Sequence, residues 1–198
     1  MSGHGGGWAN PGPAGLTALA IACFTFYAVL TGKVDHSCIP LLGCWLIGGF
    51  IVQLIVGIVE ILEGNLLGGN VFTFFAAFFM LTGGLEFFVK YAGAVNGWTI
   101  DARIDGWAWL VLSITLIIWT FGYLKTAPLA LNMVVIALDV ACPIVAFRDL
   151  GILGASYSAI AGNMLLLAGI FGIYVAAGII LNGSFGKTIL PLGGPVIK

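Results

Sequence analysis

Charged residues are so rare and so evenly spaced in this chain that they divide it into membrane-length pieces. Asp, Glu, Lys and Arg make up 8% of the residues, whereas soluble domains carry about 25%. Charge-free stretches cover 5–32, 37–59, 64–85, 106–124 and 150–186, and the stretch 126–147 is broken only by Asp139. So little charge could not cover the surface of a water-soluble globule, and we therefore expect an integral membrane protein.

The length of the apolar pieces predicts six transmembrane helices. A helix of about 20 apolar residues, rising about 1.5 Å per residue, spans a hydrocarbon core of about 30 Å. The runs are too long and too continuously apolar for membrane β-strands, which need only about 10 alternating residues. The expected fold class is an all-α integral membrane protein, a six-transmembrane-helix bundle forming a single domain over residues 1–198. The predicted spans are 14–31, 38–62, 70–91, 106–123, 127–147 and 158–181.

The remaining composition argues against several classes of protein. A net charge of −1 gives no nucleic-acid footprint, so no nucleic-acid partner is expected. The four cysteines and two histidines show no metal-ligand spacing. No catalytic triad, phosphate loop or intramembrane-protease pattern is visible. We therefore expect no enzymatic activity, no metal and no cofactor, in a chain whose surroundings are a lipid bilayer.

A stripe along the second span is the most informative polar feature. Gln53 and Glu60 recur with Gly49, Gly57 and Gly64 every three or four residues, which places them on one helix face. Polar side chains are costly in lipid, so this face should look inward. Two interpretations remain open: the lining of a polar path, or a Gln that bonds between helices and a Glu at the water boundary.

Asp139 lies just past the middle of the fifth span, where a carboxyl group must be neutral, paired or hydrated. No Lys or Arg lies at a comparable depth, so a buried ion pair is not expected. A proton carrier and an internal cap to another helix are equally open interpretations.

The third span is rich in phenylalanine, and Phe72, Phe75 and Phe79 share one helix face with Phe78 beside it. Such a row is typical of a lipid-facing or core surface. The more specific hypothesis is a hydrophobic constriction, which gates a pore by excluding water.

Three motifs resemble the acetate uptake transporter, or succinate–acetate permease, family. The leader at 10–16, Asn-Pro-Gly-Pro-Ala-Gly-Leu, is similar to the family signature Asn-Pro-Ala-Pro-Leu-Gly-Leu. The run from Gln53 to Glu60, followed by Gly64-Asn65 and Phe72-Thr73, resembles the family's second hairpin. The segment 181–193 is similar to its C-terminal signature. The three motifs occur in order and bracket nearly the whole chain.

The resemblance implies channel-like protomers, each with six helices around a narrow path, assembled as a ring-like homo-hexamer in the plasma membrane. It also implies transport of acetate and similar small monocarboxylates, and of succinate in some members, either linked to protons or passive. Family members are placed with both termini in the cytoplasm. The Lys and Arg bias of the loops here slightly favours the termini outside. We follow the family and expect cytoplasmic termini.

Carried over by alignment, the family's hydrophobic constriction falls on Leu19, on Phe75, and on Ala137 or the neighbouring Leu138. The family more often has Phe at the first of these positions and Tyr at the second. This constriction therefore lacks a tyrosine hydroxyl, which bears on how it treats a carboxylate and on whether succinate passes. Asp139 has no family counterpart that can be placed, so a proton-linked role for it would be particular to this chain.

The resemblance and the polar stripe together give a hypothesis for the substrate path. The leader residues Asn10, Pro11 and Pro13, with polar groups around Gln53, Glu60 and Thr73, receive the carboxylate. The carboxylate then enters the hydrophobic constriction, here called the neck. Two alternatives stay open. One is a channel for a small neutral solute such as urea or a short amide, and the other is a non-transporting membrane subunit.

Overall fold

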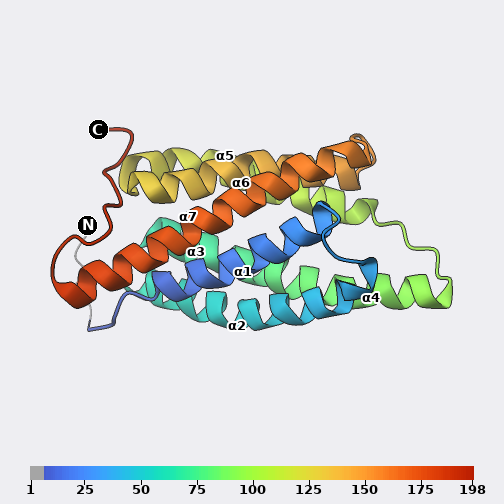
Figure 1. Cartoon of the computed structure of the whole chain (residues 1–198), viewed down its shortest axis with the longest axis horizontal. Helices are drawn as coiled ribbons and strands as arrows, with labels where there is room; N and C mark the ends of the chain where they lie inside the picture. The colour runs from blue at the N-terminus through green and yellow to red at the C-terminus, as the bar shows by residue number, and fades with distance from the viewer. Residues whose placement is uncertain (1–6) are drawn as a thin grey trace.

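The computed structural model describes residues 7–198, which form an antiparallel bundle of long helices (Figure 1). No strand occurs among the described residues. The helices are α1 (Gly12–Leu30), α2 (Ile39–Leu62), α3 (Leu66–Phe74), η2 (Phe75–Thr82), α4 (Gly83–Asn96), α5 (Arg103–Thr126), α6 (Leu129–Asp149) and α7 (Ser158–Phe185). Short 3-10 turns, η1 (His36–Cys38) and η3 (Ala155–Tyr157), come directly before α2 and α7.

Six helical segments in the described part of the chain are long and apolar enough to cross a membrane, which confirms the predicted all-α, six-span fold. They are Gly12–Leu30, His36–Leu62, Leu66–Asn96, Arg103–Thr126, Leu129–Asp149 and Ala155–Phe185. The third segment is longer at both ends than its predicted span. It begins early because the Asn65 side chain accepts a hydrogen bond from the Gly68 N–H at 3.0 Å and caps the helix. It ends late, at Asn96, because Gly97 adopts the left-handed conformation, with a φ of 70°, and caps the helix.

The middle of this third segment, η2, is a π-helix, a feature that the sequence pattern did not predict. The Thr82 hydroxyl follows the wider spacing and donates to the carbonyl oxygen of Ala77, five residues earlier, at 3.0 Å. A π-helical stretch rotates side chains away from the positions that α-helical spacing assigns. Phe75 and Phe79 are both 5% exposed, while Phe78 between them is 61% exposed.

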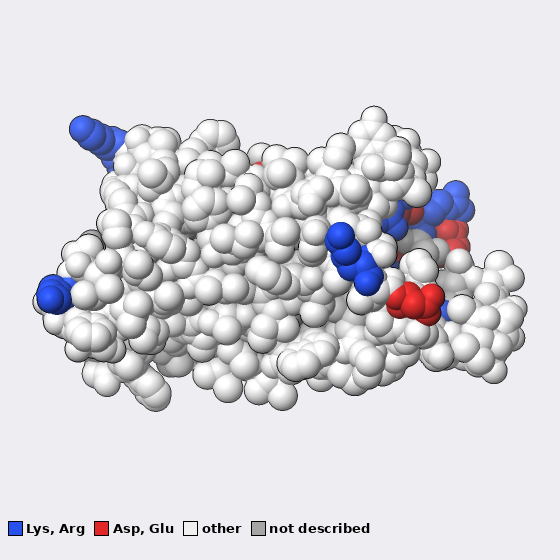
Figure 2. Space-filling model, viewed as in Figure 1, with Lys and Arg blue, Asp and Glu red and all other residues white. Residues whose placement is uncertain are grey.

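The start of α1 and the C-terminus lie at one end of the bundle, here called the terminal end (Figure 1). The loops from α2 to α3 and from α5 to α6 lie there as well. The opposite end carries the loops from α1 to α2, from α4 to α5, and from α6 to α7. Charged residues gather toward the two ends, and the visible surface between them is almost free of charge (Figure 2). This distribution suits a hydrocarbon layer between two aqueous faces.

Glycines allow the helices to approach closely. Gly162, Gly169 and Gly172, which share a face of α7, all lie against α1. A Cβ atom on Gly169 would lie 2.8 Å from the ring of Phe24, so no larger residue fits without a shift. The small residues thus bring together the backbones of helices that are far apart in the sequence.

Candidate functional site

The leader and the polar stripe of α2 meet at the terminal end. Asn10 Oδ1 accepts a hydrogen bond from the Gly12 N–H at 2.8 Å, in the turn that starts α1. A Cβ atom on Gly12 would lie 3.0 Å from Asn10 Oδ1 and 3.4 Å from Glu60 Oε1. Glycine at this position therefore lets the Glu60 carboxyl group lie beside the first turn of α1. Pro11 precedes that turn, and Pro13 is buried within it.

Glu60 is held in this position by the loop that follows α2. Its side chain is only 4% exposed, and Asn65 Nδ2 donates a hydrogen bond to its Oε2 atom. Asn65 has a second role, because its Oδ1 atom caps α3. The sequence placed Asn65 in the hairpin motif but did not identify it as the partner of Glu60, because that pairing depends on how the loop folds back.

Gln53 lies two turns deeper on the same face of α2 and is 1% exposed. Its Nε2 atom donates a long hydrogen bond of 3.4 Å to the carbonyl oxygen of Gly15 on α1. Its Oε1 atom is buried and accepts no hydrogen bond within the described residues. An amide oxygen of this kind is costly to bury unpaired, so it is well suited to accept a hydrogen bond from a ligand.

Thr73 packs against the stripe with its methyl group. A Cβ atom on Gly57 would lie 2.6 Å from Thr73 Cγ2, which shows how closely α2 and α3 approach. The Thr73 hydroxyl lies 2.9 Å from the carbonyl oxygens of both Gly69 and Asn70 on its own helix. Its proton is therefore directed to the backbone, although its oxygen keeps lone pairs that can accept.

The residues assigned to the constriction are all buried. Leu19 on α1, Phe75 in η2, and Ala137 and Leu138 on α6 belong to one cluster of buried apolar side chains. The Phe75 ring stacks on Phe74 with a centroid distance of 4.6 Å. The structure thus brings together, in one apolar core, side chains from three membrane helices that are far apart in the sequence.

A file of aromatic rings leads from Phe75 toward the opposite end. Phe75 contacts Phe79 at a centroid distance of 5.9 Å, and Phe79 contacts Phe26 at 5.4 Å. Phe26 in turn contacts Phe87 at 5.7 Å. The Lys90 ammonium group lies 5.8 Å from the centre of the Phe87 ring, within cation–π range. The sequence did not predict this file, because it combines residues of α1 and α4 with the rotated side chains of η2.

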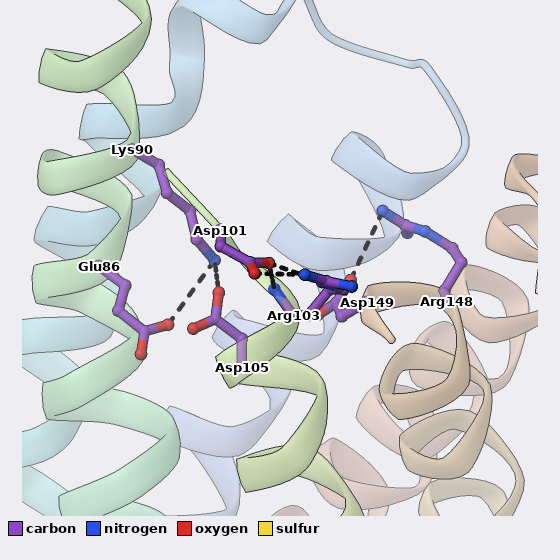
Figure 3. Close-up of polar contacts among 7 residues, drawn as sticks. All are labelled: Glu86, Lys90, Asp101, Arg103, Asp105, Arg148 and Asp149. Atoms are coloured by element: carbon purple, nitrogen blue, oxygen red, sulfur yellow. Dashed lines mark hydrogen bonds and ion pairs between the residues drawn. The ribbon is translucent and has the colours of Figure 1, made fainter. Parts of the chain in front are cut away.

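The file ends at a group of seven charged residues, here called the opposite-end cluster (Figure 3). Its members are Glu86, Lys90, Asp101, Arg103, Asp105, Arg148 and Asp149. Lys90 forms ion pairs with Asp105 on α5 and, at 3.7 Å, with Glu86 one turn earlier on α4. Lys90 is therefore shared between two carboxylates.

The other two pairs of the cluster lie at the start of α5 and the end of α6. Arg103 Nε donates to Asp101 Oδ1 at 2.8 Å, and its NH2 nitrogen donates to Asp101 Oδ2 at 2.6 Å. These hydrogen bonds lower the pKa of the exposed Asp101 carboxyl group to about 2. Arg148 lies 4.0 Å from Asp149, its neighbour in the sequence.

Asp139 lies on α6 at membrane depth and contacts α5. Its Oδ2 atom is 2.7 Å from Thr120 Oγ1, which is also 3.0 Å from the carbonyl oxygen of Leu116. Asp139 Oδ1 is buried without a hydrogen-bond partner in the described part of the chain. The carboxyl group therefore bridges two helices through the Thr120 hydroxyl rather than through the backbone at a helix end, and its proton-linked role remains a prediction.

Comparison with known proteins identifies the family to which the chain belongs. The sequence model of the GPR1/FUN34/yaaH family matches residues 6–191, nearly the whole chain. The chain belongs to the GPR1/FUN34/yaaH family. This assignment confirms the resemblance to acetate uptake transporters that the three sequence motifs indicated.

Curated members of the family cover the chain almost end to end. The succinate-acetate/proton symporter SatP of Escherichia coli K12 is 28% identical over 187 residues, which are 93% of this chain and 95% of the relative. The SatP proteins of Escherichia coli O157:H7 and Shigella flexneri match to the same extent. A solved structure of the bacterial acetate channel SatP superimposes with a TM-score of 0.81 at 27% identity, over 94% of this chain and 99% of that one.

Proposed function

We propose that this protein carries acetate and similar small monocarboxylates across the plasma membrane, along a path within each protomer. One observation carries the proposal: the fold of the SatP acetate channel is reproduced over 94% of this chain. The buried apolar side chains around Phe75 and the buried polar stripe of α2 support such a path. Nothing in this role requires enzymatic chemistry.

The terminal-end residues are suited to the neutral acid rather than the anion. Gln53 Oε1 is a buried acceptor without a donor among the described residues, and the O–H of acetic acid is a donor of matching chemistry. Glu60, two turns away on the same face, has acceptor oxygens and no cationic group, so it gives an approaching carboxylate no counter-charge. Asn10 and the Thr73 oxygen complete the polar surroundings.

The neck imposes the same preference. Leu19, Phe75, Ala137 and Leu138 offer no polar group to a passing solute, and a bare charge among them is costly. A carboxyl group of this type has a pKa of about 4–5, so acetate is mostly ionised at neutral pH. Passage of the neutral acid then moves one proton with each acetate, and uptake rises as the external pH falls.

The neck also bears on substrate range. Succinate would have to neutralise two carboxyl groups to pass an apolar constriction, so it should move more slowly than acetate. Phe75 has no hydroxyl group that could form a hydrogen bond to a carboxyl group and so reduce the cost of its passage. We propose that monocarboxylates are the main substrates and that succinate is a minor one.

The assembly and orientation are proposed from the family resemblance. Each protomer forms its own path, and protomers assemble as a homo-hexamer within the bilayer with both termini in the cytoplasm. The long exposed row Ile51, Ile55 and Ile58 on α2 is apolar, as expected for a surface that faces lipid or a neighbouring protomer.

Substrate identity is tested by uptake of labelled acetate into proteoliposomes, with an inward proton gradient and without it. Labelled urea serves as the neutral comparison solute. Saturable acetate flux that the gradient accelerates would support the proposal. Urea flux without acetate flux would favour a neutral-solute channel, and flux of neither solute would favour a non-transporting subunit.

A further inference from the structure

A polar pocket lies between α4 and the start of α5 at the opposite end of the bundle. It has a volume of about 270 Å³, which exceeds the share of about 30 Å³ per water molecule several times over. Its charged lining comes from Glu86, Lys90 and Asp105, with Thr82 as a further polar residue, and the remainder comes from apolar side chains such as Val89 and Ile104. A cation beside an apolar wall is complementary to a carboxylate that carries a short alkyl group.

Lys90 is the cation of this pocket, and its two partners hold it unequally. Asp105 is nearly buried and makes the closer contact. Glu86 is 3.7 Å away, and its side chain is 35% exposed, so this pair is the looser of the two. Figure 3 shows both carboxylates directed at the same ammonium group, one from α4 and one from α5. Glu86 is therefore the partner that a ligand carboxylate can replace with the smaller disturbance.

The charges around Glu86 explain why such a replacement would depend on protons. Lys90 faces it from its own helix, Asp105 from α5, and Asp149 from α6 with Arg148 beside it. The only charged residue of α2, which also packs against α4, is Glu60 at the terminal end. The opposite-end cluster holds one more carboxylate than it has cations, so an added anion is repelled while Glu86 stays ionised.

A row of packed aromatic rings leads from Lys90 to the neck. Lys90 contacts the ring of Phe87, and the file runs from there through Phe26 and Phe79 to Phe75. A ligand held at Lys90 thus lies at the end of the ring contacts that begin at the neck.

We propose that Lys90 binds the substrate carboxylate at the opposite end, and that the substrate takes the place of Glu86 when Glu86 accepts a proton. This inference rests on the proposed function and adds a binding site and a proton donor to it. Binding of one carboxylate anion and one proton leaves the net charge of the cluster unchanged. When the substrate leaves for the neck, the O–H bond on Glu86 breaks and an O–H bond forms on the substrate. The Glu86 carboxylate then returns to Lys90.

The test is a titration of sodium acetate into the purified full-length protein, followed by calorimetry at neutral and mildly acidic pH. Sodium chloride at the same ionic strength serves as the blank. Two buffers of different ionisation enthalpy give the number of protons taken up with acetate. For the wild type we expect tighter binding at the lower pH and net proton uptake at neutral pH.

Two substitutions separate the roles of the pair. Glu86→Gln removes the competing charge, so acetate should bind about five- to ten-fold more tightly at neutral pH, with less proton uptake. Lys90→Met should weaken binding by a similar factor, and Lys90→Arg should largely retain it. Lys33→Met is the matched control, because Lys33 is exposed and lies at the same end outside the pocket. It should bind acetate as the wild type does.

Wild-type affinity and proton uptake in Glu86→Gln would overturn the proposal, as would wild-type binding in a folded Lys90→Met. Should Lys90→Met not fold, because Asp105 is left unpaired, Glu86→Gln decides alone. The result is independent of the proposed transport function, since binding is measured at equilibrium. A protein that binds acetate through Lys90 but gives no flux would retain this site and contradict the transport proposal.

Discussion

Gln53 on α2 donates its hydrogen bond to the carbonyl oxygen of Gly15 on α1, at 3.4 Å, and leaves its own amide oxygen buried beside the first helix. This single contact joins the leader motif to the polar stripe, the two sequence features that bear most on function. It places an unused acceptor at the α1 backbone, one turn before Leu19 of a neck whose side chains are apolar.

Replacing Gln53 should therefore reduce acetate flux more than it reduces stability. Gln53→Leu keeps the volume but removes the acceptor, and we expect uptake about ten-fold slower, the equivalent of one hydrogen bond to substrate. Uptake into proteoliposomes measures the change. Asn70→Leu is the matched control, because the Asn70 side chain bonds only to the Leu66 carbonyl oxygen of its own helix. Equal losses in both variants would argue against a substrate contact at Gln53.

Phe75 and Phe78 provide a paired test of the neck. Phe75→Ala opens space in a buried cluster, so urea should begin to leak through and the selectivity for acetate over urea should fall. The cavity should also lower the stability by about 3–5 kcal/mol. Phe78→Ala, three residues away but 61% exposed, should change neither property by much. Fluxes of labelled acetate and urea, with melting curves in detergent, measure both effects. A neck elsewhere in the bundle would leave the selectivity of Phe75→Ala unchanged.

Asp139 and Thr120 separate a proton-linked role from a helix bridge. Asp139→Asn removes the titrating group, so a proton-linked Asp139 predicts that the gradient accelerates uptake several-fold less than in the wild type. Thr120→Val removes the hydroxyl at 2.7 Å but keeps the carboxyl group, so the gradient effect should persist. The measurement is uptake with the gradient divided by uptake without it. An unchanged ratio in Asp139→Asn would leave Asp139 as a bridge between α5 and α6.

The pair Asp101 and Arg103 should not contribute to the pH dependence of uptake. In the folded protein the hydrogen bonds from Arg103 lower the pKa of Asp101 to about 2. In an unfolded chain the pKa of Asp is about 3.9. Its stabilising effect is therefore complete above pH 4 and is lost only as the pH falls toward 2. Asp101→Asn should keep the wild-type pH profile of uptake between neutral and mildly acidic pH. A shifted profile would show that this loop takes part in proton linkage.

Gly57 should tolerate no side chain, because α3 lies directly against it. A Cβ atom there would lie 2.6 Å from Thr73 Cγ2 and 2.8 Å from the Thr73 backbone nitrogen. Gly57→Ala should cost about 1–3 kcal/mol through overpacking, which exceeds the helix-propensity gain of about 1 kcal/mol. Gly48→Ala, on the same helix with nothing within 4 Å of the added Cβ, should be neutral or stabilising. Melting temperatures of the two variants provide the comparison, and equal values would contradict the close approach.

Much of the fold follows from the sequence because membrane helices are specified locally. Apolar length set the six spans, whereas the packing of the α7 glycines against α1 is known only from the structure. The π-helix at Phe75–Thr82 did not follow, since it depends on hydrogen bonds that shift within an already helical, apolar segment. The α-helical pattern placed Phe75 and Phe79 on one face, in agreement with their burial, but it put Phe78 beside them and did not predict that Phe78 turns outward.

The candidate site was predicted in part, with a clear division between the two ends. Gln53 and Glu60 could be proposed from their helical spacing, and Asn10 from the resemblance of the leader to the family signature. The opposite-end cluster could not, because Lys90 meets Asp105 only through the loop that joins α4 to α5. Glu86 and Lys90 lie one turn apart on α4, and their spacing does not indicate that Asp105 of α5 also pairs with Lys90.

The most direct test of the central account is the rate of acetate uptake at constant total acetate while the external pH is lowered, with the internal pH held fixed. If the neck around Phe75 passes the neutral acid, the initial rate should rise in proportion to the protonated fraction of acetate. A rate that does not change with pH would show that the anion itself crosses, and it would contradict the account.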